Sequence, residues 1–448
     1  MTMFQFGFAK ENITPKRGVK LSGYFEPRPN IGAHDCLFVK AAVFECNGVK
    51  TGIVAYDLIG LPRTVCDFFM DELQKAGIDF AGNLVFSAIH THTAPYISMD
   101  FSPESPVDED YIRSLAAKTV SAVKIANESL AEAQMLTGKA VCHNLAFNRR
   151  FWMKDGGVLT NPGKLNPGIV GPEGEIDPDI PFFIIRQDGM DKLIVTNISN
   201  HTDTIGDEMV SADWPGRMER AIQDHYGYDI PVMTILGCQG NINHFNVKTA
   251  FDQTNYAEAC RIGKGYAAAV ISMLYSALPV EIDSISAVAE EIECPPVQIT
   301  DEEYNAAKKV VDELEGVVAS EAKDLTSEGL AAGNPYVLRY FAKRITDCRE
   351  NPMTEKRIER MVALKFGKAL CIQTLPCEPF VELGFAIKAA STFPCTIIAA
   401  VANGYMGYLG MPDCYERGGG YETRPSRTAP AHDLAPKLIA LGIKLING

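Results

Sequence analysis

Apolar and polar positions along this chain repeat in two ways. Short segments alternate or are almost wholly apolar, which is typical of β-strands with one or both faces buried. Longer segments place apolar residues three and four positions apart, which is typical of helices with one buried face. The expected strands are 4–9, 37–46, 51–57, 84–89, 136–148, 180–186, 192–198, 232–236, 361–366, 369–375 and 396–401. The expected helices are 62–77, 108–133, 215–226, 255–278, 300–322, 380–390 and a last one from Leu434.

This order of elements predicts an α/β fold in which mixed β-sheets are covered by helices. Short turns such as Asn47-Gly48 and Gly367-Lys368 separate neighbouring strands and predict hairpins. No repeat or low-complexity tract divides the chain, so we expect a single large domain over 1–448. The stretch 300–360 is the most charged and predicts a helical insertion or subdomain. Residues 153–175 hold six glycines and three prolines, which predicts a long surface loop that could act as a lid.

Composition excludes some classes of protein. The 448 residues are 46% hydrophobic and 22% charged, which is ordinary for a soluble globular chain. The formal net charge of −14 disfavours nucleic-acid binding and binding to anionic membranes. We read no signal peptide and no membrane-spanning run of about 18 apolar residues. Twelve cysteines without a CxxC pair favour the cytoplasm and argue against a cysteine-based zinc site. We expect a small-molecule substrate, with homo-oligomerisation left open.

The segment LVFSAIHTHTAP carries the first candidate chemistry. Six apolar or small residues predict a buried strand, and His90 and His92 follow at its end. If the backbone is still extended there, both imidazoles lie on the same face of the strand. They could then share a metal ion, or one could bind metal while the other transfers protons. Two polar residues in a loop are the alternative for an isolated pair of this kind.

Other predicted strands also end in residues that bind metals or carry protons. These ends are Asp57, His90 and His92, His201 and Asp203, Gly240-Asn241, Glu378, and Tyr408. In sheets flanked by helices, ligand sites lie beyond the carboxyl ends of strands, so we expect several of these residues to meet. Two histidines and a carboxylate suit a catalytic zinc ion that keeps one position open for water. For Asp57, as for His34 and Asp35, structural hydrogen bonds are the expected role.

Several motifs together resemble the neutral/alkaline ceramidase family. They are GFAKENITP, Gly23-Tyr24, His34-Asp35, the HTHTAP run, NHTD, and NGYMGYLGMPDCYERGGGYET. The resemblance covers roughly residues 5–250 and 360–435 and implies a ceramidase-like catalytic domain. The family consists of zinc-dependent amidases.

The resemblance also implies roles for individual residues. His90, His201, Glu378 and Tyr408 correspond to the zinc ligands of the family, and His92 corresponds to its acid/base group. Arg149 and Tyr421 correspond to the groups that hold the substrate carbonyl and its developing oxyanion. Each of these assignments has a structural alternative. The histidines could be hydrogen-bonded core residues, Glu378 could cap a helix, and Tyr408 could be a core tyrosine. Arg150 could point into the site in place of Arg149.

Two departures from the family pattern affect the expected substrate. The Gly-Asp-x-Ser-Pro stretch of the ceramidases reads Gly240-Asn241-Ile242-Asn243-His244 here, so an acid and a hydroxyl are replaced by amides. Full-length ceramidases are secreted or surface-bound and carry a C-terminal β-sandwich domain, which we expect this chain to lack. Both departures argue against ceramide itself as the substrate.

The sequence therefore predicts a zinc-dependent hydrolase that cleaves a non-peptide C–N amide bond in a small soluble N-acylated compound. A zinc-dependent esterase or lactonase is the first alternative, because the same zinc chemistry serves it. A homologue that binds metal or ligand without turnover is the second.

Overall fold

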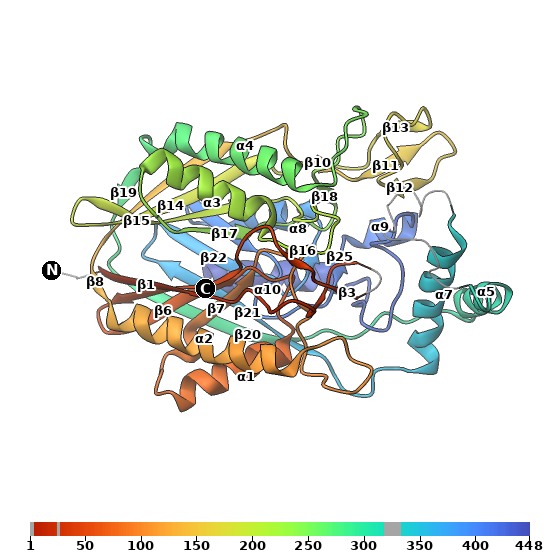
Figure 1. Cartoon of the computed structure of the whole chain (residues 1–448), viewed down its shortest axis with the longest axis horizontal. Helices are drawn as coiled ribbons and strands as arrows, with labels where there is room; N and C mark the ends of the chain where they lie inside the picture. Colours follow the sequence, from red (N-terminus) through yellow and green to blue (C-terminus); the bar gives the residue numbers. More distant parts are fainter. Residues whose placement is uncertain (1–3, 25–26, 318–332) are drawn as a thin grey trace.

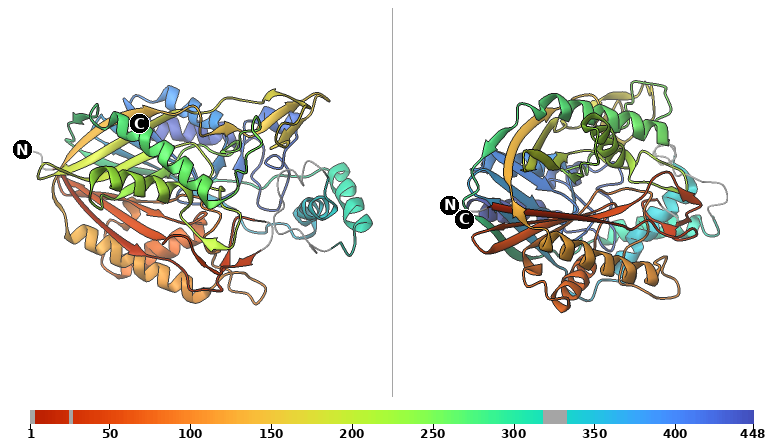
Figure 2. Two further views of the ribbon diagram at one scale, coloured as in Figure 1. Left: turned by 45° about the horizontal axis from the view of Figure 1, so that its top comes forward. Right: turned by 60° about the vertical axis from the view of Figure 1, so that its left-hand side comes forward.

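The computed structural model describes residues 4–24, 27–317 and 333–448. Three β-sheets face one another around a central core, and helices cover the outer face of each (Figures 1 and 2). This arrangement confirms the predicted α/β class with mixed, helix-covered sheets.

The first sheet has the strand order β7-β6-β5-β1-β8. All its neighbouring pairs are antiparallel except β6 and β7, which are parallel. Helices α1 and α2 pack on its outer face. The bounds are β1 Phe4–Asn12, β5 Phe38–Cys46, β6 Val49–Tyr56, β7 Leu84–Ala88, β8 Ala131–Glu132, α1 Arg63–Lys75 and α2 Glu109–Glu128, with a short 3-10 helix at Ala81–Asn83.

The second sheet has the order β17-β15-β14-β9-β19, and only β15 and β17 are parallel. Helices α3 and α4 cover it. The bounds are β9 Gln134–Val141, β14 Asp179–Gln187, β15 Met190–Ile198, β17 Val232–Leu236, β19 Leu278–Val280, α3 Asp213–Tyr226 and α4 Tyr256–Leu274.

The third sheet has the order β20-β21-β22-β24, and again only its last pair, β22 and β24, is parallel. Helices α8 and α10 cover it. The bounds are β20 Ile285–Glu293, β21 Ile358–Phe366, β22 Leu370–Thr374, β24 Cys395–Ala399, α8 Val381–Ala390 and α10 Leu434–Asn447.

The central core is built from one face of each sheet. Phe44 of β5, Phe183 of β14 and Phe366 of β21 meet there, with ring centroids 5.0 to 6.4 Å apart. Alternate residues of the same strands face the covering helices; in β5, Val43 packs toward α1 and α2. Because both faces of these strands are buried, their sequences read as almost continuous apolar runs.

Short paired strands connect the sheets near one end of the molecule. They are β2 Lys20–Leu21 with β3 Arg28–Pro29, β4 Gly32–Ala33 with β16 Met209–Val210, β10 Phe147–Asn148 with β18 Ile242–Asn243, and β23 Glu378–Pro379 with β25 Tyr408–Leu409. The remaining elements are β11 Arg150–Met153, β12 Val158–Thr160, β13 Ile169–Pro172, α5 Asp301–Glu313, α7 Pro335–Glu350 and α9 Pro412–Arg417.

Two sequence predictions are wrong in detail. Residues 153–175 are not an open loop, because β11, β12 and β13 form a small antiparallel sheet there; its short strands lie between glycines, which hide the alternation. The predicted strand 136–148 is two strands, β9 and β10, that belong to different sheets.

Helices α5 and α7 lie within the stretch predicted as a helical insertion, and they project together from one end of the molecule (Figures 1 and 2). The capping box at Thr300 and Glu303 opens α5 as predicted. The helix ends at Glu313, and part of the predicted 300–322 helix lies outside the described residues. The division into one catalytic domain and an insertion stays a prediction. Among the helices of the described residues, none is long and apolar enough to span a membrane.

Candidate metal centre and active site

The candidate site lies where the parallel strand pairs of the three sheets end. His90 follows β7, His201 follows β15, and the segment 239–243 follows β17. Glu378 follows β22, and Tyr408 follows β24. Parallel neighbours end at the same edge of a sheet, which is why these distant segments meet.

His90 lies in a strained turn directly after β7. Its φ angle is 61°, so the backbone is no longer extended, and the premise that both histidines leave one face of an extended strand is wrong. The turn nevertheless brings the rings of His90 and His92 together, with centroids 5.1 Å apart. Strain of this kind persists only where the surrounding structure compensates for it. Here Nδ1 of His90 donates a 2.6 Å hydrogen bond to the Ile59 carbonyl, which fixes the ring.

His201 is held in the same manner from the second sheet. Its Nδ1 donates to the carbonyl oxygens of Gln239 and Ile242, at 2.8 and 2.9 Å. The indole nitrogen of Trp214 donates to the His201 carbonyl at 2.8 Å. The ring is fully buried, and its Nε2 is left facing the site.

Glu378 completes the group from the third sheet. Its Oε2 lies 3.2 Å from Nε2 of His90 and 3.1 Å from Nε2 of His201. Its Oε1 accepts a 2.6 Å hydrogen bond from the hydroxyl of Tyr405. The carboxylate is 2% exposed, so water does not screen it.

These three side chains together require a positive charge between them. Carbonyl oxygens only accept hydrogen bonds, so Nδ1 of both His90 and His201 carries a proton, and Nε2 of each ring faces the Glu378 carboxylate. A buried carboxylate needs a positive charge beside it, which either a second proton on an imidazole or a metal ion held by the two Nε2 atoms would supply. A backbone carbonyl at Nδ1 is also the usual second partner of a metal-binding imidazole. The residues therefore fit a bound metal ion.

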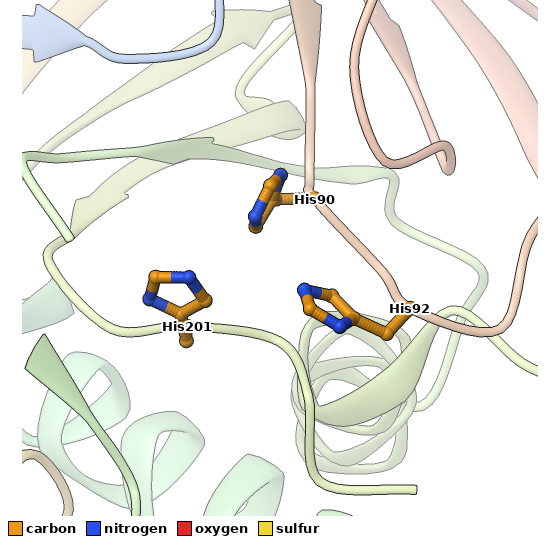
Figure 3. Close-up of side chains that lie close together, drawn as sticks. All are labelled: His90, His92 and His201. Atoms are coloured by element: carbon orange, nitrogen blue, oxygen red, sulfur yellow. The ribbon is translucent and has the colours of Figure 1, made fainter. Parts of the chain in front are cut away.

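His92 lies beside this group. Ligand atoms of His90, His92 and His201 all lie within 4.8 Å of one another, and the three rings point toward a common space (Figure 3). Nε2 of His92 is buried without a hydrogen-bond partner among the described residues, as is Nε2 of His90. The arrangement is compatible with a third imidazole ligand and with a base next to the ion.

The pKa values in the site follow from burial and from these charges. Burial, and then His90, lower the pKa of His92 to about 3, so its ring is neutral. Burial alone would raise the pKa of Glu378, but the imidazoles lower it well below the ordinary value. Burial and the nearby Arg149 lower the pKa of His201. For His90, burial acts downward, but the Glu378 carboxylate outweighs it and raises the pKa.

Two tyrosines line the site near Glu378. Tyr405 donates to the carboxylate, whereas Tyr408 is half-buried, with its ring centroid 6.3 Å from that of His201. Burial and the Glu378 charge raise the pKa of Tyr408 well above its ordinary value. The metal-ligand role that the sequence resemblance assigns to Tyr408 stays a prediction.

Arg149, and not Arg150, points into the site. Its Nη1 lies 3.5 Å from Nε2 of His201, and its Nη2 donates to the Gly240 carbonyl at 2.6 Å. Its guanidinium carbon lies 5.2 Å from the ring centroid of Tyr408 and 5.1 Å from that of Tyr421. One arginine and two phenols therefore border the same space as the imidazoles.

Glu422 holds both arginines in place. Its Oε1 lies 2.9 Å from Nε of Arg149, and its Oε2 lies 3.1 Å from Nη1 of Arg150. Thr160 donates to the same Oε2 at 2.5 Å. Arg150 turns away from the site and also pairs with Glu173. All five side chains are buried or nearly so, and Glu422 thereby fixes the direction of Arg149.

The segment that departs from the ceramidase motif serves the site through its backbone. Asn241 accepts from the Arg149 amide through its carbonyl, and its side chain caps α8 by accepting from the Val381 amide at 2.9 Å. The amide of Asn243 donates to Asn161 at 3.1 Å. These amides therefore connect loops and do not reach the imidazoles by any hydrogen bond in the described residues.

His244 forms an ion pair behind the site. Its Nδ1 donates to Asp203 at 3.1 Å, and its Nε2 donates to the Gln253 carbonyl at 2.7 Å. With both nitrogens facing acceptors, the ring carries two protons and a positive charge. Burial alone would lower the pKa of His244, but Asp203 raises it.

Sequence reasoning singled out the histidines, Glu378, Arg149 and Tyr421 for one site and named Asp203 among the strand ends, but it gave no role to Tyr405 or Glu422. For Glu422 the only available signal was its position next to Tyr421. Asp57, as expected, is a structural hydrogen bonder; it accepts from the Phe38 amide at 2.8 Å.

Two solved structures are similar to this chain over its whole length. One is a ceramidase complexed with C2, with a TM-score of 0.74 and 17% identity, covering 100% of this chain and 75% of that one. The other is the neutral ceramidase from Pseudomonas aeruginosa, with a TM-score of 0.73 and 18% identity, covering 100% of this chain and 74% of that one. No family model and no curated protein matches the sequence. The chain therefore shares the fold of neutral ceramidases, as the sequence motifs predicted.

Proposed function

We propose that this protein is a zinc-dependent hydrolase of a non-peptide C–N amide bond in a small N-acylated compound. The observation that carries the proposal is the convergence of two Nε2 atoms and the Glu378 carboxylate in a buried space that fits a cation. Nitrogen and carboxylate donors suit zinc, and the shared fold with neutral ceramidases supports amide hydrolysis.

His90, His201 and Glu378 would hold the ion, with Tyr408 as the further ligand that the motif resemblance suggests. When bound, zinc lowers the pKa of a coordinated water to about 7 and polarises a substrate carbonyl. All other steps fall to side chains of the chain itself.

Arg149 and Tyr421 would orient the substrate carbonyl and stabilise its developing negative charge. Both groups are held rigidly, Arg149 by Glu422 and the Gly240 carbonyl, and Tyr421 against Arg149. Donors fixed in advance stabilise a transition state without having to reorganise during the reaction. Their burial strengthens the interaction, because little water screens it.

His92 would transfer the proton to the leaving amine. Its ring is neutral, lies next to those of His90 and His201, and has a buried Nε2 with no hydrogen-bond partner among the described residues. A neutral imidazole can accept a proton and pass it on, which is the usual role of histidine in hydrolysis.

The test is hydrolysis of a panel of N-acyl amines, with matched esters and lactones, by protein treated with chelator and then supplied with zinc. We expect chelation to abolish amide hydrolysis and zinc to restore it. We also expect His90→Ala to lose turnover and metal, whereas His143→Ala, at an exposed histidine, should keep both. Turnover of esters or lactones alone would favour the esterase alternative. Stoichiometric zinc without turnover of any compound would favour the binding protein.

A further inference from the structure

The loop that follows β7 is fastened to β2 and to the residues that come after it. The Ser22 amide donates to the Ala94 carbonyl at 2.9 Å. Leu21 and Pro95 form an antiparallel β-bridge between the two segments. The N-terminal part of the chain therefore runs beside His92, the histidine proposed to transfer the proton.

The Gly23-Tyr24 pair, one of the motifs in the sequence, packs directly on the His92 side chain. Gly23 has a φ angle of 97°, and a Cβ on it would lie 2.6 Å from Cβ of His92, so this approach requires glycine. The ring of Tyr24 meets the His92 ring edge-on, with centroids 5.7 Å apart. The hydroxyl of Tyr24 donates to the Ile205 carbonyl at 2.7 Å, which holds the phenol in place.

Arg28 holds the backbone of His92. Its Nη2 donates to the His92 carbonyl at 3.2 Å, and its Nη1 donates to the carbonyls of Gly206 and Asp207 at 3.0 and 2.9 Å. On the other side of the residue, the His92 amide donates to the Thr202 carbonyl at 3.2 Å. Both backbone polar groups of His92 are therefore bonded, and both bonds connect it to the loop that follows β15.

The guanidinium of Arg28 is an unusual group to bury at this point. The residue is 8% exposed, no carboxylate pairs with it among the described residues, and its Nε has no hydrogen-bond partner there. The face of Tyr24 covers it, with the guanidinium carbon 3.9 Å from the ring centroid. A buried cation without an acid partner costs stability, so its presence calls for a functional explanation. Its bonds join the two loops on either side of His92.

We infer that Arg28 is a positioning residue for proton transfer by His92. The inference rests on the proposed function, which assigns this transfer to His92. Nε2 of His92 has no hydrogen-bond partner among the described residues, so the ring takes its direction from the bonded backbone and from its packing on Tyr24. Arg28 supports both, because it bonds the His92 carbonyl and stacks on Tyr24. A reacting group that is misplaced by about 1 Å can lose about 100-fold in rate.

The kinetics of Arg28→Met, alone and together with His92→Ala, test the inference. Methionine fills the space of the arginine stem but donates no hydrogen bond. For the N-acyl amine that the zinc-loaded wild type hydrolyses fastest, Arg28→Met should lower kcat about 10- to 100-fold and change KM by less than about threefold. In a chain that already carries His92→Ala, the same change should lower kcat by no more than about twofold. Arg17→Met, at an exposed arginine of the same part of the chain, is the matched control and should behave like the wild type.

Histidine NMR separates this inference from the proposed function. In zinc-loaded protein with carbon-13 in its histidine rings, the His92 signal is the one that His92→Ala removes. We expect Arg28→Met to shift or broaden this signal more than any other and to keep the zinc, whereas Arg17→Met should leave the signal in place. If the wild type hydrolyses no amide, the proposed function fails, and the His92 signal still decides the inference.

Four results would overturn the inference: a His92 signal that is the same in Arg28→Met and Arg17→Met, an unchanged kcat, an equal loss of kcat with and without His92, or loss of zinc. Arg28→Lys keeps a buried cation that can donate to a carbonyl, and its kcat should lie between those of the wild type and Arg28→Met. If Arg28→Met does not fold, Arg28→Lys takes its place in both experiments, with the same criteria.

Discussion

The ion pair between Arg149 and Glu422 gives the account a quantitative test. Both side chains are almost fully buried, and their closest atoms, Nε and Oε1, are 2.9 Å apart. Glu422→Gln keeps the shape of the side chain and removes its charge. Arg150 would keep its ion pair with Glu173. Arg149 would keep the Gly240 carbonyl, the contact with His201 and the faces of two tyrosines, but no carboxylate among the described residues.

Removal of one partner of a buried ion pair costs about 3–5 kcal/mol, because the other charge stays buried without compensation. Unfolding of globular proteins releases about 2 cal/mol/K of entropy per residue, so a chain of 448 residues should melt roughly 3–5 °C lower. The zinc content of the variant should not change, because no contact within the described residues joins Glu422 to an imidazole. Amide hydrolysis should fall at least about tenfold, because Arg149 loses its fixed direction.

Thermal unfolding, zinc content and kcat/KM would be measured on this variant and on Glu416→Gln, an exposed carboxylate in the same part of the chain. The control should match the wild type in all three measurements. If Glu422→Gln behaved like the control, the claim that this buried network positions Arg149 would be wrong. Loss of zinc along with activity would also contradict it, because the effect would then arise at the metal ligands.

Three further predictions concern stability, the core and the metal. Burial raises the pKa of Glu359 to about 7, so near pH 6 the folded state still holds a proton that the unfolded state has lost. The free energy of unfolding should therefore fall by up to roughly 3 kcal/mol as the pH rises from about 5 to 7. Glu359→Gln should remove this pH dependence in urea titrations. Phe44→Ala removes the ring that contacts Phe183 and Phe366 from the other two sheets, and should cost about 3–5 kcal/mol of unfolding free energy. Tyr405→Phe deletes the 2.6 Å hydrogen bond to Glu378 and should weaken zinc binding about 10- to 100-fold in a competition assay. It should also lower the unfolding free energy of the metal-free protein by about 1–3 kcal/mol in urea titrations, because the buried carboxylate loses a partner.

Much of the fold could be predicted because local patterns determine it. The hairpin at Asn47-Gly48 is a clear case, since both residues adopt positive φ angles and the strands on each side are apolar. The small sheet of β11, β12 and β13 could not be recognised, because its strands are short and its register shifts at Trp152 and Met153. The pairing of β9 with β14 and of β10 with β18 depends on contacts across the chain that no local pattern encodes.

The sequence predicted several residues that meet in the candidate site, but not how their side chains are arranged. The expectation that site residues follow the ends of strands identified His90, His201 and Glu378. It assumed an extended backbone at His90, where the φ angle is 61°. It could not find Glu422 or Tyr405, because their roles come from what they touch in the folded chain. The cytoplasmic location, the partners and the oligomeric state stay predictions from composition.

The most direct test of the central claim is a zinc-edge anomalous diffraction map of the protein crystallised after chelator treatment and incubation with zinc. The account predicts one strong peak at about 2.0–2.2 Å from Nε2 of His90, Nε2 of His201 and a carboxylate oxygen of Glu378. A map with no peak between these three side chains, or with zinc bound only elsewhere on the protein, would contradict it.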